Sequence, residues 1–186
     1  MKIICIIPAR KNSSRLKNKN TLNFCGRPLF EWTIRLSKKV KYLNQIVISS
    51  DDEKILNYKK KYPKMIFLKR PKNISKKYTK ISEVIKYTLK YFKKFGKKFD
   101  AVVILQPTSP LRKIKTINLA LKKFIKYKPD YLASVSEIKN TQYPNMLFLK
   151  KNKEFVQDTV LSNKSLKKKY FCLDGGVIFI FKNKNS

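Results

Sequence analysis

Cationic and amide side chains are concentrated in a short segment that directly follows the first apolar run of the chain. The apolar run is Ile3 to Ile7, and the thirteen residues that follow it contain only Ala9 and Leu16 as ordinary apolar side chains. Guanidinium, ammonium, hydroxyl and amide groups in one loop suit a polyanion such as a nucleoside triphosphate, whereas a solvated basic loop is the other interpretation. The side chains that we consider as ligands in this segment are Arg10, Asn12, Ser13, Lys19 and Asn20.

Two more polar segments follow apolar runs further along the chain. Residues 70–80 follow a run that ends at Leu68, and residues 106–112 follow a run that ends at Leu105. Because the carboxyl ends of parallel strands lie at one edge of a sheet, and open α/β sheets bind ligands there, we expect the three polar segments to converge. The candidate ligands in these two segments are Arg70, Thr79 and Gln106.

The pattern of apolar residues predicts strands and helices in alternation. Short apolar runs, which indicate buried strands, occupy Ile3–Ile7, Gln45–Ser49, Met65–Leu68, Ala101–Leu105, Tyr131–Val135 and Val177–Phe181. Apolar residues at helical spacing predict helices from Pro28 to about Lys39, from Ile81 to Phe95 and from about Thr116 to Lys126. This alternation is typical of a three-layer, Rossmann-like α/β fold with a mostly parallel sheet.

Several local details of these helices are also predicted. Gly96 is expected to end the second helix, and Asp52 is expected to cap a short helix after Ser50, although Asp51 and Asp52 are also considered as a metal-binding pair. The core face of the first helix is predicted to carry Leu29, Trp32, Thr33 and Leu36. The core face of the second is predicted to carry Ile81, Val84, Ile85, Thr88, Leu89 and Phe92.

The strand–helix rhythm breaks in residues 137–170. This region contains a possible hairpin of Met146–Leu149 against Glu154–Val156. We expect 137–170 to form a small subdomain inserted into a single domain that covers 1–186, and to make dimer contacts.

The net charge of +34 suggests a nucleic-acid-binding protein. However, the cations are 39 lysines and only 6 arginines, and the lysines are spread over every segment. Lys, Asn, Ile, Phe and Tyr are all abundant and all have AT-rich codons, so base composition explains the charge better and we expect no nucleic-acid partner. An arginine kept in such a chain suggests a bidentate contact that lysine cannot make. Four of the six lie at positions of interest: Arg10, Arg15, Arg70 and Arg112.

The lengths of the apolar runs and the cysteine and histidine content bear on location and on the possible chemistry. No apolar run approaches the roughly 18 residues of a membrane span, and the first apolar run is too short for the core of a signal peptide. We therefore expect a cytoplasmic protein without a membrane partner. Cys5, Cys25 and Cys172 lack metal-binding spacing, and the absence of histidine leaves no imidazole base.

The polar segments resemble, in order and spacing, the motifs of the acylneuraminate cytidylyltransferases, the CMP-N-acetylneuraminic acid synthetases. The segment Ile6–Asn20 is similar to the family's Pro-Ala-Arg loop with its following Lys-Asn. Leu105–Arg112 is similar to the family's most distinctive motif. Weaker similarities cover Val47–Glu53, Leu68–Pro71 and the Gly-Gly pair at 175–176.

The resemblance implies a fold, a reaction and roles for individual residues. The fold is that of the nucleotide-diphospho-sugar transferases, and the reaction transfers CMP from CTP to an acidic nine-carbon sugar, with Mg²⁺ as cofactor and a homodimer as the expected assembly. Arg10 and Lys19 are the implied catalytic residues. The nucleotide would contact Arg10, Asn12, Ser13, Lys19, Asn20, Arg70 and Thr79, and the sugar would contact Gln106 and Asp174.

Three alternatives stay open at this point. The acceptor could be neuraminate, legionaminate or pseudaminate, and CMP-Kdo synthetase is a near relative with a similar Ser-Ser-Arg-Leu segment. The family's metal-binding Asp-x-Asp pair is expected after the last strand, but the sequence ends at Ser186 before such a pair. The metal ligands are therefore unassigned, and an inactive nucleotide-binding remnant is the alternative from another functional class.

Overall fold

The computed structural model describes residues 1–12, 16–138, 147–151, 154–158, 170–173 and 178–183. Two candidate ligands, Ser13 and Asp174, lie outside these described residues. None of the described helices has both the length and the apolar character needed to cross a membrane.

The central sheet has six strands in the order β5-β4-β1-β6-β12-β7. β1 is parallel to both of its neighbours, β4 is parallel to β5, and β12 runs antiparallel to β6 and β7. This confirms the prediction of a mostly parallel sheet. The strands are β5 (Ile66–Lys69), β4 (Gln45–Ser50), β1 (Ile3–Pro8), β6 (Ala101–Ile104), β12 (Phe179–Lys182) and β7 (Tyr131–Ala133).

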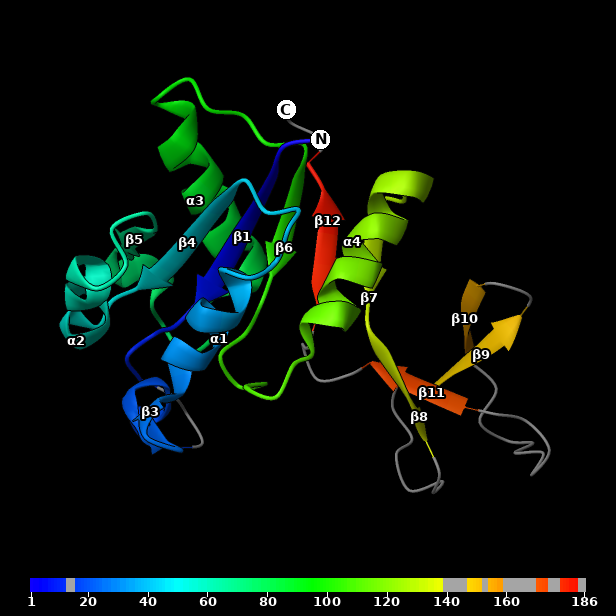
Figure 1. The fold of residues 1–186 in the computed structure, drawn as a ribbon, viewed down its shortest axis with the longest axis horizontal. Helices are drawn as coiled ribbons and strands as arrows, with labels where there is room; N and C mark the ends of the chain where they lie inside the picture. The colour runs from blue at the N-terminus through cyan, green and yellow to red at the C-terminus, as the bar shows by residue number, and fades with distance from the viewer. Residues whose placement is uncertain (13–15, 139–146, 152–153, 159–169, 174–177, 184–186) are drawn as a thin grey trace.

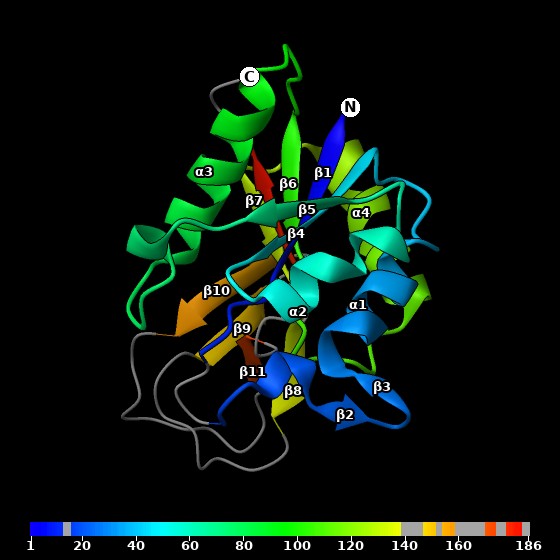
Figure 2. The ribbon, with the colours of Figure 1, turned by 90° about the vertical axis from the view of Figure 1, so that its left-hand side faces the viewer.

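Helices cover both faces of this sheet, which gives the three layers expected from the sequence (Figures 1 and 2). On one face, α1 (Leu29–Ser37) and α4 (Ile114–Tyr127) pack against alternate residues of β1. On the other face, α3 (Ile81–Lys93) packs against the remaining residues of that strand. Because both faces of β1 are covered, its sequence is a continuous apolar run rather than an alternating one. Short helices complete the layers: α2 (Glu53–Leu56), η1 (Lys19–Thr21), η2 (Asn57–Lys60) and η3 (Lys72–Ile74).

The predicted core face is confirmed for most of α3 and only in part for α1. α3 buries Val84, Thr88 and Phe92, whereas the predicted Ile81 is 39% exposed. Gly96 follows the end of α3 with a φ of 66°, a left-handed conformation that glycine adopts without strain. In α1, Thr33 is buried and Leu36 is partly buried against the core, whereas Leu29 and Trp32 are not among the core residues. The buried residues are Phe30, Glu31, Thr33, Ile34 and Ser37. Two adjacent sides of α1 carry apolar residues, so spacing alone does not decide which of them faces the sheet.

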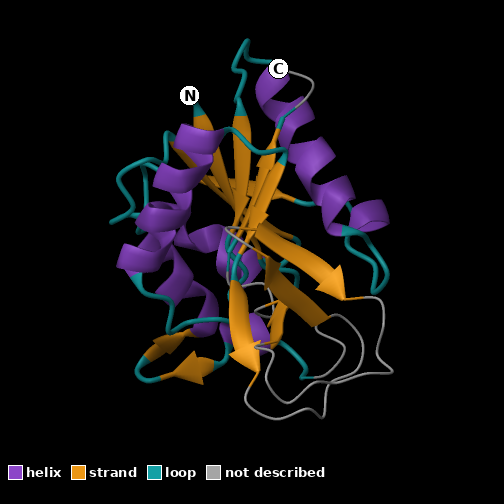
Figure 3. Ribbon diagram, turned by 90° about the vertical axis from the view of Figure 1, so that its right-hand side faces the viewer, coloured by secondary structure: helices purple, strands orange, loops and turns teal. Residues whose placement is uncertain are grey.

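A second sheet is attached where β7 ends and β12 begins. Its order is β10-β9-β11-β8, and the predicted hairpin is confirmed because β9 and β10 pair antiparallel. Figures 1 and 3 show this sheet beside the end of the central sheet toward which β1 and β6 run. The predicted strand at 131–135 is divided between β7 and β8. The four strands are β8 (Val135–Ile138), β9 (Leu147–Lys151), β10 (Glu154–Asp158) and β11 (Tyr170–Leu173), and a two-residue hairpin pair, β2 (Asn23–Phe24) and β3 (Arg27–Pro28), precedes α1.

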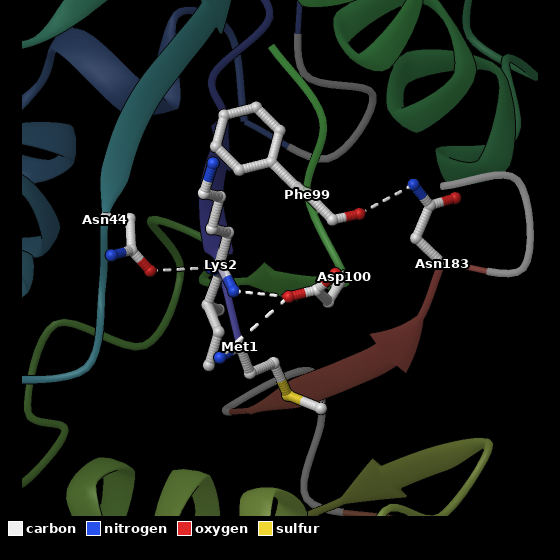
Figure 4. Close-up of polar contacts among 7 residues, drawn as sticks. Met1, Lys2, Asn44, Phe99, Asp100 and Asn183 are labelled. Atoms are coloured by element: carbon white, nitrogen blue, oxygen red, sulfur yellow. Dashed lines mark hydrogen bonds and ion pairs between the residues drawn. The ribbon is translucent and has the colours of Figure 1, made fainter.

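The opposite end of the central sheet is closed by hydrogen bonds among residues from distant parts of the chain (Figure 4). The carboxylate of Asp100 accepts a hydrogen bond from the backbone N–H of Lys2 at 2.5 Å. The backbone N–H of Asn183 donates to the carbonyl of Asp100 at 2.8 Å. The side-chain oxygen of Asn44 accepts from the N–H of Ile3 at 2.7 Å. The start of β1, the start of β6 and the end of β12 are therefore held together.

Candidate functional site

The carboxyl end of β4 joins the loops that follow its two neighbouring strands. The carbonyl of Ser49 accepts hydrogen bonds from the N–H of Ala9 and from the guanidinium of Arg70, both at 2.9 Å. The buried hydroxyl of Ser50 donates to the carbonyl of Ala9 at 2.6 Å and accepts from the N–H of Asp52 at 3.0 Å. The N–H of Arg70 in turn donates to the carbonyl of Ser50 at 2.7 Å. These bonds fix the loops after β1 and β5 to the same strand end.

Arg70 is a buried cation at the base of this edge. Its side chain is 5% exposed, and its Nε also contacts the hydroxyl of Ser49 at 3.3 Å. Burial lowers the pKa of Arg70 from its ordinary value, an effect that Asp51 opposes and Arg10 reinforces. The guanidinium is thus committed to the end of β4, and its predicted contact with a nucleotide remains a prediction.

Arg10 connects the loop after β1 to the segment after β5. Its Nη1 donates to the carbonyls of Lys76 and Lys77, at 2.9 and 3.1 Å. The next residue, Lys11, donates its backbone N–H to the carboxylate of Asp51 at 2.8 Å. Two of the three polar segments, 8–20 and 70–80, are therefore in direct contact, as predicted, although they are far apart in the chain. The third segment, 106–112, follows β6, which pairs with β1.

The amide of Asn20 closes the loop after β1 on itself. Asn20 lies in the short helix η1, is 6% exposed, and donates to the carbonyl of Arg10 at 2.8 Å. The residue before this helix, Asn18, has a φ of 52°, a left-handed conformation that asparagine tolerates better than most residues. Lys19 is half-buried on the same turn. The short, rigid turn thus presents a cation directly beside the structural amide.

The loop after β6 is held by Arg112. This buried arginine donates to the carbonyl of Gln106 and, at 3.3 Å, to the hydroxyl of Thr33 in α1. These two hydrogen bonds anchor the loop after β6 to the neighbouring helix α1. Gln106 itself is half-buried just beyond the end of β6, the strand paired with β1.

The remaining candidates differ in how far they take part in these contacts. Thr79 is half-buried and Asn12 is exposed on the two loops that Arg10 connects. Asp52 accepts a hydrogen bond from the N–H of Lys54 at 3.0 Å, which confirms it as the cap of α2. The roles of Ser49 and Ser50 were missed by the sequence reasoning. Their signal is the position of two hydroxyl residues at the end of a buried apolar strand, where loop carbonyls and N–H groups need partners.

The described residues do not fit a Mg²⁺ site built by the protein alone. No group of three or more His, Cys, Asp or Glu side chains able to hold a metal occurs among them. The carboxylates of Asp51 and Asp52, considered above as a metal pair, each accept a hydrogen bond from a backbone N–H.

The geometry suits an anionic ligand with several charged groups. Arg10, Lys19 and Arg70 bring three cations to the loops at the end of β1 and β5, while Gln106 offers an uncharged donor and acceptor at the end of the adjacent β6. Charge placed in advance where a reaction develops negative charge is the usual basis of phosphoryl-transfer catalysis.

Comparison with known proteins agrees with this chemistry. A family model described as cytidylyltransferase matches residues 4–166. A pseudaminic acid cytidylyltransferase of Campylobacter jejuni is 32% identical over 144 residues, which cover 77% of this chain and 61% of that protein. A CMP-N,N'-diacetyllegionaminic acid synthase of Legionella pneumophila is 36% identical over 124 residues, which cover 65% of this chain and 52% of that protein. The chain thus spans 61% and 52% of the lengths of these two relatives.

A solved structure shows the same fold. A CMP:2-keto-3-deoxy-manno-octonic acid synthetase, solved in complex with CTP, superimposes with a TM-score of 0.76 over 98% of this chain and 74% of that one. The sequence identity is 16%, so this likeness concerns the fold.

Ser50→Ala tests the junction at the end of β4. The substitution removes one donor and one acceptor from a buried site, so we expect the free energy of unfolding in urea to fall by about 1–3 kcal/mol. Ser82→Ala, on the exposed surface of α3, is the matched control and should change the free energy by less than about 0.5 kcal/mol. Equal effects of the two substitutions would show that the Ser50 hydroxyl does not hold the loops.

Proposed function

The chain belongs to the cytidylyltransferase family, and from this membership we propose that it transfers CMP from CTP to a sialic-acid-like nonulosonate and releases pyrophosphate. The relatives named for pseudaminic and legionaminic acids support a nonulosonate acceptor. The single observation that carries the proposal is the contact of Arg10 with the carbonyls of Lys76 and Lys77. This contact supports the proposal because it brings together the loops after β1 and β5, where the triphosphate would bind.

In the proposed reaction, a hydroxyl oxygen of the sugar attacks the α-phosphorus of CTP. A new oxygen–phosphorus bond forms as the bond between the α-phosphorus and the bridging oxygen breaks. Pyrophosphate departs with that oxygen, and the proton of the attacking hydroxyl is released to the solvent. Arg10 and Lys19 would neutralise the charge on the transferred and departing phosphates. The main contribution of the protein is therefore positioning and electrostatic stabilisation rather than covalent catalysis.

The other candidate ligands are assigned to the two substrates. Arg70 and Thr79, on the segment after β5, and the turn that contains Asn20 would surround the cytidine. Gln106 would hydrogen-bond the sugar, together with Asp174. Asn12 and Ser13 would donate to phosphate oxygens.

The proposal also includes a cofactor, an assembly and a location. Mg²⁺ would be bound chiefly through the phosphates of CTP, because Mg²⁺ commonly takes only one or two protein carboxylates in such sites. Its chemical contribution would be to neutralise phosphate charge. We further propose a cytoplasmic homodimer, with the second sheet of β8 to β11 as its contact surface.

Pyrophosphate release tests the proposed function. The protein is incubated with CTP and Mg²⁺ and, separately, with neuraminate, legionaminate, pseudaminate or Kdo as acceptor. We expect release that depends on the metal and on one of the nine-carbon acids. Preference for Kdo would transfer the assignment to CMP-Kdo synthesis. CTP binding without release for any acceptor would instead indicate a nucleotide-binding protein without turnover.

Lys19→Ala tests the proposed charge stabilisation. Removing a cation that stabilises the transition state should lower kcat/KM by about a hundredfold or more. Lys17→Ala removes an equal charge from an exposed position of the same loop and is expected to change kcat/KM less than about threefold. A Lys19→Ala enzyme that releases pyrophosphate at the rate of the parent protein would exclude the catalytic role.

Gln106→Ala tests the proposed sugar contact. Loss of the side-chain hydrogen bonds should raise the KM for the sugar by about tenfold and leave the KM for CTP nearly unchanged. Thr108→Ala, at an exposed position of the same loop, serves as the control. A selective rise in the KM for CTP would instead place Gln106 at the nucleotide.

A further inference from the structure

A pocket of about 750 Å³ lies beside α1. Its walls come from the β2–β3 hairpin, from α1 and the two lysines that follow it, from Tyr62, and from the segment 110–114. Trp32 and Leu36, both predicted for the core face of α1, line this pocket, and Leu36 also packs against the core. The apolar side of α1 that carries Trp32 is therefore part of a surface pocket.

Arginine is strongly concentrated in this pocket. The chain has six arginines among 45 basic residues, yet three of the six, Arg27, Arg35 and Arg112, are among its lining residues. Two of these, Arg27 and Arg35, have no part in the proposed transferase site. A chain that uses lysine almost everywhere thus places arginine here, where its planar fork can bind an oxyanion through two parallel hydrogen bonds.

The aromatic wall of the pocket is held in place by the hairpin. The indole N–H of Trp32 donates to the carbonyl of Phe24 at 2.7 Å, and the guanidinium of Arg27 lies 5.4 Å from the ring centroid. The ring is consequently oriented before any ligand arrives. With Leu36 and Ile114 it forms an apolar surface next to the cations.

The acidic residue nearest to this region on α1 is already neutralised. Glu31 is 1% exposed, forms an ion pair with Lys61 at 2.8 Å and accepts a hydrogen bond from the hydroxyl of Tyr62. Burial and this hydrogen bond raise the pKa of Tyr62 to about 12. No Asp or Glu occurs among the described residues that line the pocket.

We propose that this pocket binds a small organic oxyanion, a carboxylate or phosphate ester on a flat apolar body. The anionic group would contact Arg35 and Arg27, and the apolar body would lie against Trp32 and Leu36. The site is distinct from the nucleotide and sugar positions, although Arg112 connects it to the loop that carries Gln106. This inference does not depend on the transferase reaction.

Trp32 makes the proposal directly testable, because it is the only tryptophan of the chain. The probe is 8-anilinonaphthalene-1-sulfonate, an oxyanion on an aromatic body, and its uncharged counterpart is N-phenyl-1-naphthylamine. We expect the sulfonate to quench Trp32 saturably, with energy transfer to the dye, and the uncharged dye to bind at least about tenfold more weakly. Equal binding of the two dyes would overturn the proposal.

Substitutions separate this pocket from general attraction to a basic surface. Arg35→Gln should weaken binding of the sulfonate by about tenfold. Lys90→Gln removes the same charge from an exposed position on α3, across the sheet, and should change it by less than about twofold. Circular dichroism verifies that both variants are folded. Equal weakening in the two variants, or none in Arg35→Gln, would show that the dye does not occupy this pocket.

Saturating CTP with Mg²⁺ distinguishes the pocket from the transferase site. We expect the sulfonate to remain bound and Trp32 to remain quenched in the presence of the nucleotide. Complete displacement of the dye by CTP would mean that the probe occupies the cationic loops at the strand ends, and the proposal would fail while the transferase assignment would stand.

Discussion

The hydrogen-bonding requirement of the buried end of β4 determines how the site is arranged. A strand that ends in the interior leaves carbonyl and N–H groups that cannot reach water, and such groups are costly without partners. At Ser49 and Ser50 these partners are the backbone of Ala9, the guanidinium and backbone of Arg70, and the cap of α2. The loops that carry the proposed nucleotide ligands are therefore positioned by the same bonds that complete the sheet. A substitution that breaks these bonds would therefore disturb the sheet and the proposed site together.

The strands, the helices and the layers of the fold could be predicted from the sequence, because they depend on the periodicity of apolar residues. Continuous apolar runs such as Ile3–Ile7 require helices on both faces, and this follows from burial alone. The direction of individual polar side chains was harder to predict, because it depends on partners from other elements. For Asn20 and Arg70, both predicted ligands, nothing in the sequence indicated that their side chains donate to backbone carbonyls of the same site. On α1 the prediction omitted the buried Phe30 and Ile34 and included Trp32, because both sets of residues satisfy helical spacing.

The few acidic residues of this chain often serve as acceptors for backbone hydrogen bonds. The sequence has 11 acidic residues against 45 basic ones, and several of the described carboxylates accept hydrogen bonds from backbone N–H groups rather than only pairing with surface lysines. The acceptors are the carboxylates of Asp51, Asp52, Glu83 and Asp100, and the donors are the backbone N–H groups of Lys11, Lys54, Lys80 and Lys2, respectively. In a chain with strong like-charge repulsion, carboxylates thus lie where they fix the backbone as well as reduce the charge.

The closed end of the sheet has a consequence for how the chain folds. Lys2 and Asn183 both bind Asp100, at the end of the sheet remote from the loops of Arg10 and Gln106 (Figures 1 and 4). Both hydrogen bonds join parts of the chain that are far apart in sequence, so they form only once the ends of β1, β6 and β12 have come together. Closing such long loops costs chain entropy before the new contacts contribute stability. The closed end is therefore a product of long-range assembly rather than of local structure.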